Sequence, residues 1–180
     1  MLYSYEECIK KYGNHYQIMK RIENKDLYKI ECGIYSDKSR TSEIEVISYK
    51  YPNAIFTMNS AFYFYSLTDV IPDKYFLATS KDAYKIPDNR IKQTFQRDER
   101  INLGKSVIEY QNAMLPIYDQ ERMLIELIRN RRTLSFDYYK EIIENYRKRI
   151  RNLDIEKLQY YISMFPNQNR IFEAIQLEVF

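Results

Sequence analysis

The sequence contains few residue combinations that could carry out catalysis. His15 is the only histidine among 180 residues, so a Ser–His–Asp or Cys–His arrangement has a single candidate base. Cys8 and Cys32 form no CxxC pair, which predicts reduced thiols rather than a zinc site or a disulfide framework. No glycine-rich loop of the phosphate-cradling kind is present. We therefore predict a non-enzymatic protein with no catalytic residues, no metal site and no cofactor.

Two groups of charged residues still suggest a site. Glu23-Asn24-Lys25 is the only Glu-x-Lys pair, which a metal-dependent nuclease would need, although a solvated helix end explains it better. Asp119, Glu121 and Arg122 could bind an anion or a partner. The structural alternative is that Asp119 caps a helix and Arg122 pairs with a carboxylate near the helix start.

Positive charge is concentrated in one segment. The whole chain carries only +3, but residues 129–151 hold eight basic side chains against three acidic ones, a local charge of +5. An apolar stripe with helical spacing should face the core there: Phe136, Tyr139, Ile143, Tyr146 and Ile150. A candidate basic patch is then turned towards solvent: Arg147, Lys148, Arg149 and Arg151. It could follow phosphates, or it could be an ordinary solvated helix face.

The first 36 residues are predicted to form two short helices followed by two short strands. Ser4 is expected to cap a first helix, with Glu7 at the capping-box position, and Gly13 to end that helix. Asn14 should cap a second helix whose apolar face consists of Ile18, Met19 and Ile22. The β-prone residues 27–35, interrupted by Gly33, predict two short strands.

Two helices joined by a tight turn and followed by a hairpin are the order of a helix-turn-helix with a wing. In that arrangement the second helix enters the major groove. The expected DNA-binding residues are His15, Gln17, Lys20, Arg21 and Lys29. His15 stands near the start of this helix, where it could donate to a phosphate or be an exposed polar residue.

The remaining residues predict a sheet followed by helices. Strand patterns occupy residues 54–58, 75–79, 91–95, 107–110 and 114–118. From Asp119 onward the period becomes helical, and Asp154 and Asn169 are expected to cap later helices. Strands first and helices afterwards favour an α+β fold. The longest uncharged run, between Lys50 and Asp69, contains Pro52 and two asparagines, which predicts a buried strand and helix and no membrane span. Glu6 and Glu7 stand where a secretory signal would need an apolar run, which predicts a cytoplasmic protein.

Four stretches of the sequence resemble the AbiEi family of antitoxins of type IV toxin–antitoxin systems. They are Gly33-Ile34-Tyr35-Ser36-Asp37; a block from Pro52 to Pro72 that includes Asn59-Ser60-Ala61-Phe62-Tyr63; the helix start Ile117-Tyr118-Asp119-Gln120-Glu121-Arg122; and a tail with Leu153-Asp154 and Leu158-Gln159-Tyr160-Tyr161. The stretches follow one another in the family's order and span nearly the whole chain.

This resemblance implies a fold, a role and partners. It implies a short winged helix-turn-helix head, residues 1–38, lacking the family's usual first helix, and an antitoxin domain, residues 39–180, with a central β-sheet and a C-terminal helical bundle. It further implies an antitoxin that opposes a nucleotidyltransferase-like toxin without forming a stable complex with it, and that represses its own operon by binding operator DNA. Such systems act in abortive infection, an antiviral defence.

The sequence leaves two alternatives open besides the nuclease. The chain could be an interaction module that acts through the antitoxin domain alone, without binding DNA. It could also form a homodimer, in which case its operator would be an inverted repeat.

Overall fold

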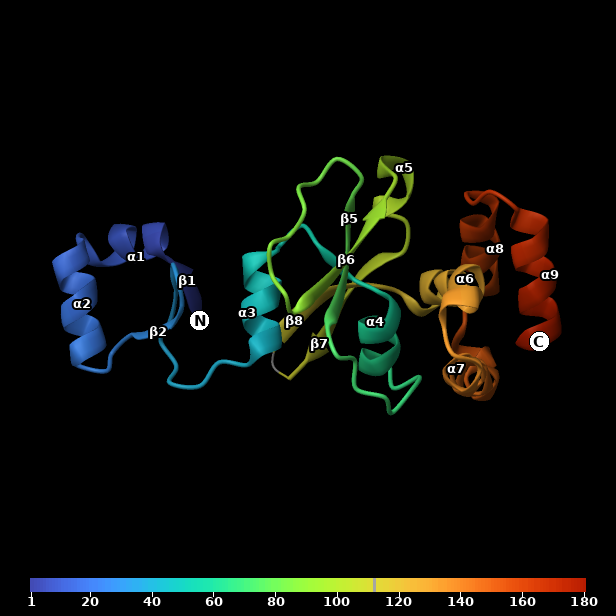
Figure 1. The fold of residues 1–180 in the computed structure, drawn as a ribbon, viewed down its shortest axis with the longest axis horizontal. Coiled ribbons are helices and arrows are strands. Elements are labelled where there is room, and N and C mark those ends of the chain that lie inside the picture. Colours follow the sequence, from blue (N-terminus) through green and yellow to red (C-terminus); the bar gives the residue numbers. More distant parts are fainter. Residues whose placement is uncertain (112) are drawn as a thin grey trace. The chain divides into compact units, whose positions relative to one another are not determined.

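The computed structural model describes residues 1–111 and 113–180, apart from the side chain of Asp98. The fold is α+β, with a mixed sheet and a C-terminal helical region (Figure 1). The strands are β1 (Leu2–Ser4), β2 (Tyr28–Glu31), β3 (Ile34–Ser36), β4 (Ile55–Phe56), β5 (Tyr75–Ser80), β6 (Ile91–Gln96), β7 (Lys105–Tyr110) and β8 (Ala113–Tyr118). The α-helices are α1 (Tyr5–Tyr12), α2 (His15–Glu23), α3 (Glu43–Lys50), α4 (Met58–Phe64), α5 (Asp98–Ile101), α6 (Gln120–Asn130), α7 (Phe136–Lys148), α8 (Ile155–Ser163) and α9 (Gln168–Glu178). Two 3-10 helices, η1 (Arg131–Thr133) and η2 (Ile150–Asn152), flank α7.

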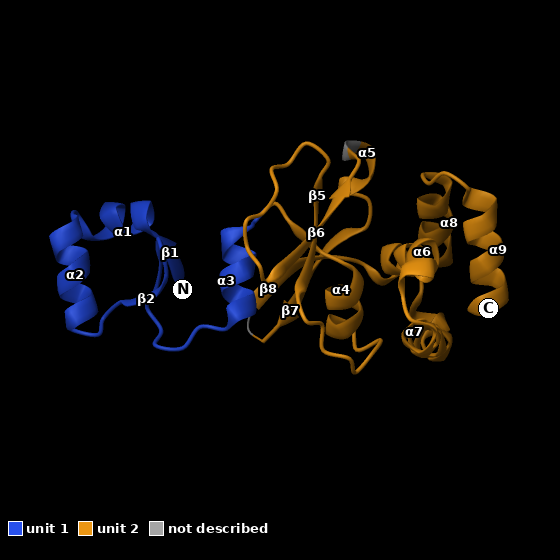
Figure 2. Ribbon diagram, in the orientation of Figure 1, with its two compact units in different colours: residues 1–52 blue, residues 53–180 orange. Residues whose placement is uncertain are grey.

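The chain divides into two compact units, residues 1–52 and 53–180 (Figure 2). The expected domain boundary after residue 38 lies inside the first unit, before α3. Helix α3 belongs to the first unit because Val46 packs against Leu2 and Ile34.

The first unit is built around a small antiparallel sheet with the strand order β1-β3-β2. The predicted capping box is confirmed: the Glu7 N–H donates to Ser4 Oγ, and the Ser4 N–H donates to the Glu7 carboxylate. The core between the sheet and the first two helices contains Cys8, Ile18, Leu27 and Tyr35.

The sequence patterns did not predict α3. Its residues include the β-branched Ile44, Val46 and Ile47, which favour strands in isolation. All three are buried, and the Glu45 N–H donates to Ser42 Oγ at the helix start. Burial and capping therefore outweigh the local preference here.

The second unit contains a five-stranded sheet with the order β6-β5-β4-β8-β7. The β5–β6 and β4–β8 pairs are parallel, and the β4–β5 and β7–β8 pairs are antiparallel. All five strands lie at or next to the predicted β-prone runs. Their order was not predictable from local patterns, because the central pairs join segments far apart in the sequence.

Helix α6 connects this sheet to the C-terminal helices. It packs against α4, α8 and α9, and eight consecutive residues, 121–128, are buried. A helix that is buried all round lies inside its domain rather than on its surface. The second unit is therefore organised around α6.

Two predictions about the C-terminal helices were wrong. Phe136 does not face the core: its side chain is 75% exposed because it lies at the first position of α7, while Tyr139, Ile143 and Tyr146 of the same stripe are buried. The last helix begins at Gln168, and its cap is Asn167 rather than the expected Asn169. Asn167 precedes it in the left-handed conformation, with φ of 60° and no side-chain cap. Asparagine tolerates this conformation well.

Among the described residues, none of the helices combines the length and the apolar character that crossing a membrane requires.

Candidate nucleic-acid interface

Helix α2 is positioned by residues at its start and on one face. Gly13 ends α1 with φ of +96°, and its N–H donates to the Ile9 carbonyl at 2.8 Å. Asn14 Oδ1 then accepts from the Gln17 N–H at 3.0 Å, which confirms the predicted cap of α2. Ile18 is fully buried beneath the helix. The turn between the two helices is therefore only two residues long, and α2 has one face fixed against the core.

The predicted DNA-binding side chains of α2 are all exposed to solvent. They are His15, Gln17, Lys20 and Arg21, and Lys29 is exposed on β2. Gln17 and Lys20 point away from the buried Ile18, whereas His15 and Arg21, three residues before and after it, flank it. Met19 also faces outward and is 42% exposed, so the prediction that it joins the apolar face was wrong. Ile18 and Ile22 suffice for packing, because a helix of nine residues presents only a narrow stripe to this small core.

Two of these side chains already make contacts within the first unit. His15 Nδ1 lies 3.4 Å from the Tyr5 hydroxyl, and the two rings stack at an angle. The Arg21 guanidinium lies 4.9 Å from the centre of the Tyr12 ring and 3.6 Å from the Asp26 carboxylate. Asp26 therefore offsets part of the Arg21 charge, whereas Lys20 and Lys29 make no ion pair with any side chain that the structure describes.

Sequence reasoning missed two further exposed residues of the first unit. Tyr16, at the second position of α2, is 70% exposed. Lys11 of α1 donates to the Tyr3 hydroxyl at 2.8 Å and lies over the Tyr3 ring. This hydrogen bond is the largest cause of the raised pKa of Lys11, so the amine stays charged. Tyr16 stands between His15 and Gln17 in the sequence, and this position was the available signal for it.

The candidate basic patch of the second unit is not a uniform solvated surface. Arg149 is half-buried and donates to the carbonyls of Tyr65 and Ser66, at 2.5 and 2.7 Å. Arg147 Nε donates to the Glu178 carbonyl at 2.7 Å, and Lys148 to Asn145 Oδ1 at 3.1 Å. Arg151 is exposed. Arg149 therefore stabilises the loop after α4 through these two hydrogen bonds.

The group Asp119, Glu121 and Arg122 forms the centre of the second unit. Asp119 caps α6 by accepting from the Arg122 N–H at 2.8 Å, as the structural alternative predicted. The side chain of Arg122 pairs instead with Glu126, one turn further along, at 2.8 Å. The prediction of a partner near the helix start was therefore wrong. The fully buried guanidinium reaches forward because the Tyr118 and Phe165 rings enclose it.

Lys157 connects these acids to α8. Its amine lies 2.9 Å from Asp119 and 3.5 Å from Glu121. Desolvation, the largest single effect, lowers the pKa of Lys157, but the hydrogen bond and the attraction of both carboxylates together raise it. Glu121 also accepts from the Asp154 N–H at 3.0 Å. Both acids of the group are thus bound to α8.

Within the part of the chain that the structure describes, no three His, Cys, Asp or Glu residues lie close enough together to hold a metal ion. Glu23 and Lys25, the pair considered for a nuclease, are exposed at the end of α2.

The chain matches no protein-family model and no curated protein. Its fold is similar to that of a solved structure, the RV2827C protein from Mycobacterium tuberculosis, with a TM-score of 0.63 and 11% sequence identity. The match covers 98% of this chain and 71% of that one. At this identity the likeness extends to the fold alone.

Proposed function

We propose that this protein is a DNA-binding repressor and antitoxin of the AbiEi type. The observation that carries the DNA-binding part is the order of elements in the first unit. Strand β1 precedes two helices joined by a tight turn, and β3 pairs with both β1 and β2. This is the order of a winged helix-turn-helix, in which α2 would be the recognition helix and β2–β3 the wing.

Helix α3 supports this proposal by supplying a third helix. The resemblance implied a head without its first helix, and such a head would bury little apolar surface. Val46 packs against the sheet, and the Tyr49 hydroxyl donates to Glu7 of α1. This hydrogen bond is the first cause of the lowered pKa of Glu7. Helix α3 thus stabilises the start of α1.

Lysines on the exposed face of this unit give the sharpest test of DNA binding. Lys20→Gln and Lys29→Gln together should weaken binding to the protein's own promoter and reduce its salt dependence. Each lost phosphate contact lowers the slope of log K against log salt by about 0.9. The matched control is Lys81→Gln, an exposed lysine of the second unit. Equal loss in the control, or no loss in the double variant, would refute the role of α2.

The antitoxin part is supported by the resemblance, which spans nearly the whole chain. We propose a cytoplasmic protein whose second unit opposes a nucleotidyltransferase-like toxin encoded nearby, without forming a stable complex with it. Co-expression of the full chain should restore growth of cells arrested by that toxin. The Lys20→Gln/Lys29→Gln variant should rescue growth equally well while failing to repress the promoter. Absence of rescue by the soluble wild-type chain would refute this part.

The rescue and promoter-binding measurements also distinguish the proposed repressor from an interaction module that does not bind DNA. An interaction module without DNA binding would rescue growth, but its wild-type form would show equal affinity for promoter and scrambled DNA at physiological salt. A homodimer would instead prefer a promoter fragment that contains an inverted repeat.

A further inference from the structure

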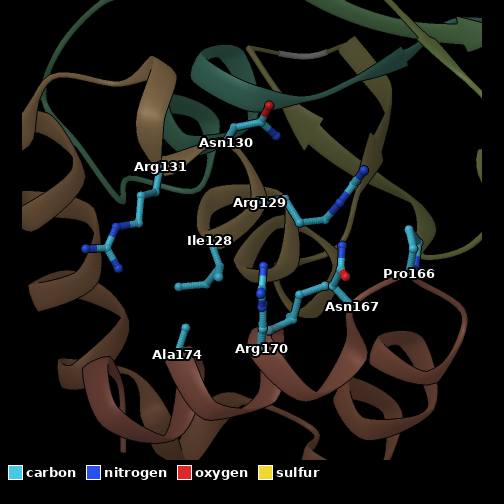
Figure 3. Close-up of a pocket in the computed structure, with 9 residues that line it drawn as sticks. Ile128, Arg129, Asn130, Arg131, Pro166, Asn167, Arg170 and Ala174 are labelled. Carbon is cyan, nitrogen blue, oxygen red and sulfur yellow. The ribbon is translucent and has the colours of Figure 1, made fainter.

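Two pockets of the second unit meet at Arg129. The first has a volume of about 330 Å³ and lies between the start of α4, the end of β6 and the end of α6. The second has a volume of about 380 Å³ and lies between the end of α6 and the start of α9 (Figure 3). Arg129 and Asn130 line both pockets. Each volume is in the range of small-molecule sites.

Arginines dominate the charge of both pockets. Arg97 and Arg100 line the first, and Arg131 and Arg170 line the second. Figure 3 shows Arg170 extending from α9 toward the end of α6, with Arg131 turned away from it. Arg131 is neutralised by Glu178 at 2.7 Å. Arg97, Arg100 and Arg170 form no ion pair with the side chains that the structure describes.

Among the described side chains, the lining of the two pockets includes one carboxylate, Glu126, and its oxygens already accept hydrogen bonds. Glu126 accepts from Arg129 through both of its oxygens at 3.0 Å, and from the buried Arg122 at 2.8 Å. The amide of Asn130 donates to it as well, at 3.2 Å. The described side chains around Glu126 thus include four arginines: Arg97, Arg100 and Arg129 of the pocket lining and the buried Arg122. Counted over the described side chains, the first pocket keeps an excess of positive charge.

Arg100 has a hydrogen-bond donor that is not used. Its Nε is buried and finds no partner among the described residues. Its guanidinium lies 5.2 Å from the centre of the Phe165 ring, which also supports Arg122 and Arg129 at 4.6 Å each. Desolvation first, and then repulsion from Arg129, Arg97 and Arg122, lower the pKa of Arg100. A buried donor without an acceptor is unfavourable. An anion in the pocket would supply an acceptor for Nε and would offset the repulsion between Arg100 and the neighbouring arginines.

We propose that these two pockets form one binding groove for a phosphorylated small molecule of the nucleotide class, with a phosphate group held by Arg97, Arg100 and Arg129. Planar guanidinium groups donate in pairs to phosphate oxygens, and three of them match an anion with three free oxygens better than a carboxylate with two. The hydroxyls of Thr57 and Thr94 and the amide of Gln96 line the same pocket and can hydrogen-bond further oxygens. Arg170 and the apolar Ile128 and Ala174 receive the rest of the ligand.

The test is calorimetric titration of the full-length chain at low salt. The probes are pyrophosphate, ATP and, as an uncharged comparison, adenosine. We expect saturable binding of pyrophosphate and ATP and none of adenosine. Arg97→Gln and Arg100→Gln should each weaken ATP binding at least about tenfold, the effect of losing one charge-assisted contact. The control is Arg132→Gln, an exposed arginine that lines neither pocket, which should change the affinity less than about twofold.

Two sets of outcomes would overturn this inference. One is the absence of saturable ATP or pyrophosphate binding, including the case in which only a single-stranded RNA oligonucleotide binds. The other is unchanged ATP affinity in the Arg97→Gln variant, which alters an exposed side chain and should fold even if Arg100→Gln does not. Promoter binding should be the same in all three variants, so failure here is distinguishable from failure of the DNA-binding proposal.

Discussion

Gly104 lies directly against Arg122, so that a Cβ atom at position 104 would be only 2.5 Å from the Cβ of Arg122. The Gly104 carbonyl also accepts from the Asp119 N–H at 2.8 Å, just before α6 begins. With φ of +76°, this residue combines a left-handed backbone with a close approach that no side chain can share. The turn before β7 thereby fixes the start of α6.

We expect Gly104→Ala to destabilise the second unit by about 3 kcal/mol or more, because strain and a clash with a fixed atom add together. Gly33→Ala is the matched control: Gly33 has the same φ of +76°, but nothing lies within 4 Å of its added Cβ. That substitution should cost only the strain, about 1 kcal/mol. The measurement is denaturant unfolding of each variant. If both variants lost the same free energy of unfolding, the close approach of Gly104 to Arg122 would not contribute to stability.

Replacing Arg122 should destabilise the fold strongly without altering an exposed surface. Its side chain donates to Glu126 and to the carbonyls of Arg100 and Leu103, at 3.2 and 3.4 Å. Arg122→Met would leave these acceptors buried, at a cost of about 3–5 kcal/mol in the free energy of unfolding. Arg132→Gln should stay within about 0.5 kcal/mol of the wild type. A stable Arg122→Met variant would contradict this role.

Within the candidate basic patch, Arg149 and Arg151 should behave differently. Arg149 holds two carbonyls of the loop after α4, which Asn145 also anchors through the Leu67 carbonyl. Arg149→Gln should therefore cost about 1–3 kcal/mol, the range for hydrogen bonds to charged groups. Arg151→Gln should change stability by less than about 0.5 kcal/mol. Thermal unfolding of the two variants measures both. Similar, small shifts would mean that the patch is a solvated helix face after all.

Alkaline pH should destabilise the second unit through its tyrosines. Burial is the largest cause of the raised pKa of Tyr65, Tyr118, Tyr138, Tyr139, Tyr146 and Tyr161. For Tyr161 the pKa rises to about 12. Between the ordinary value of 10.0 and this one, the unfolded chain loses the proton while the folded chain keeps it. Stability must then fall as pH rises, by up to about 1.4 kcal/mol per pH unit for each such tyrosine.

Tyr161→Phe tests this prediction directly. The variant loses the hydrogen bond to Asp119 at every pH, but it should also show a shallower decline of stability above pH 10, the ordinary tyrosine value. The control is Tyr160→Phe, which removes a ring that is 59% exposed on the same helix. Unfolding free energies across the alkaline range give the slopes. An identical slope in wild type and Tyr161→Phe would contradict the assignment.

The sequence by itself determined the local structure. Ser4 with Glu7, and Asn14 after Gly13, specified the first two helices because capping joins residues at most a few positions apart. The β-prone runs located the strands of the second unit, and Asp119 located the start of α6. The exposure of Gln17 and Lys20 followed from the position of Ile18, since the helical period turns residues one and two positions away from it towards the other side.

Only the tertiary structure decided which distant segments meet. The order β6-β5-β4-β8-β7 and the pairing of β1 with β3 join residues that no local pattern links. Helix α3 formed against its own β-branched composition because three of its residues are buried. The two arginine-lined pockets depend on β6, α5, α6 and α9 coming together, with Phe165 against Arg100 and Arg129. The spacing of these arginines in the sequence did not predict the pockets. Packing brings these side chains together, and their electrostatic environment therefore cannot be predicted from the order of residues in the sequence.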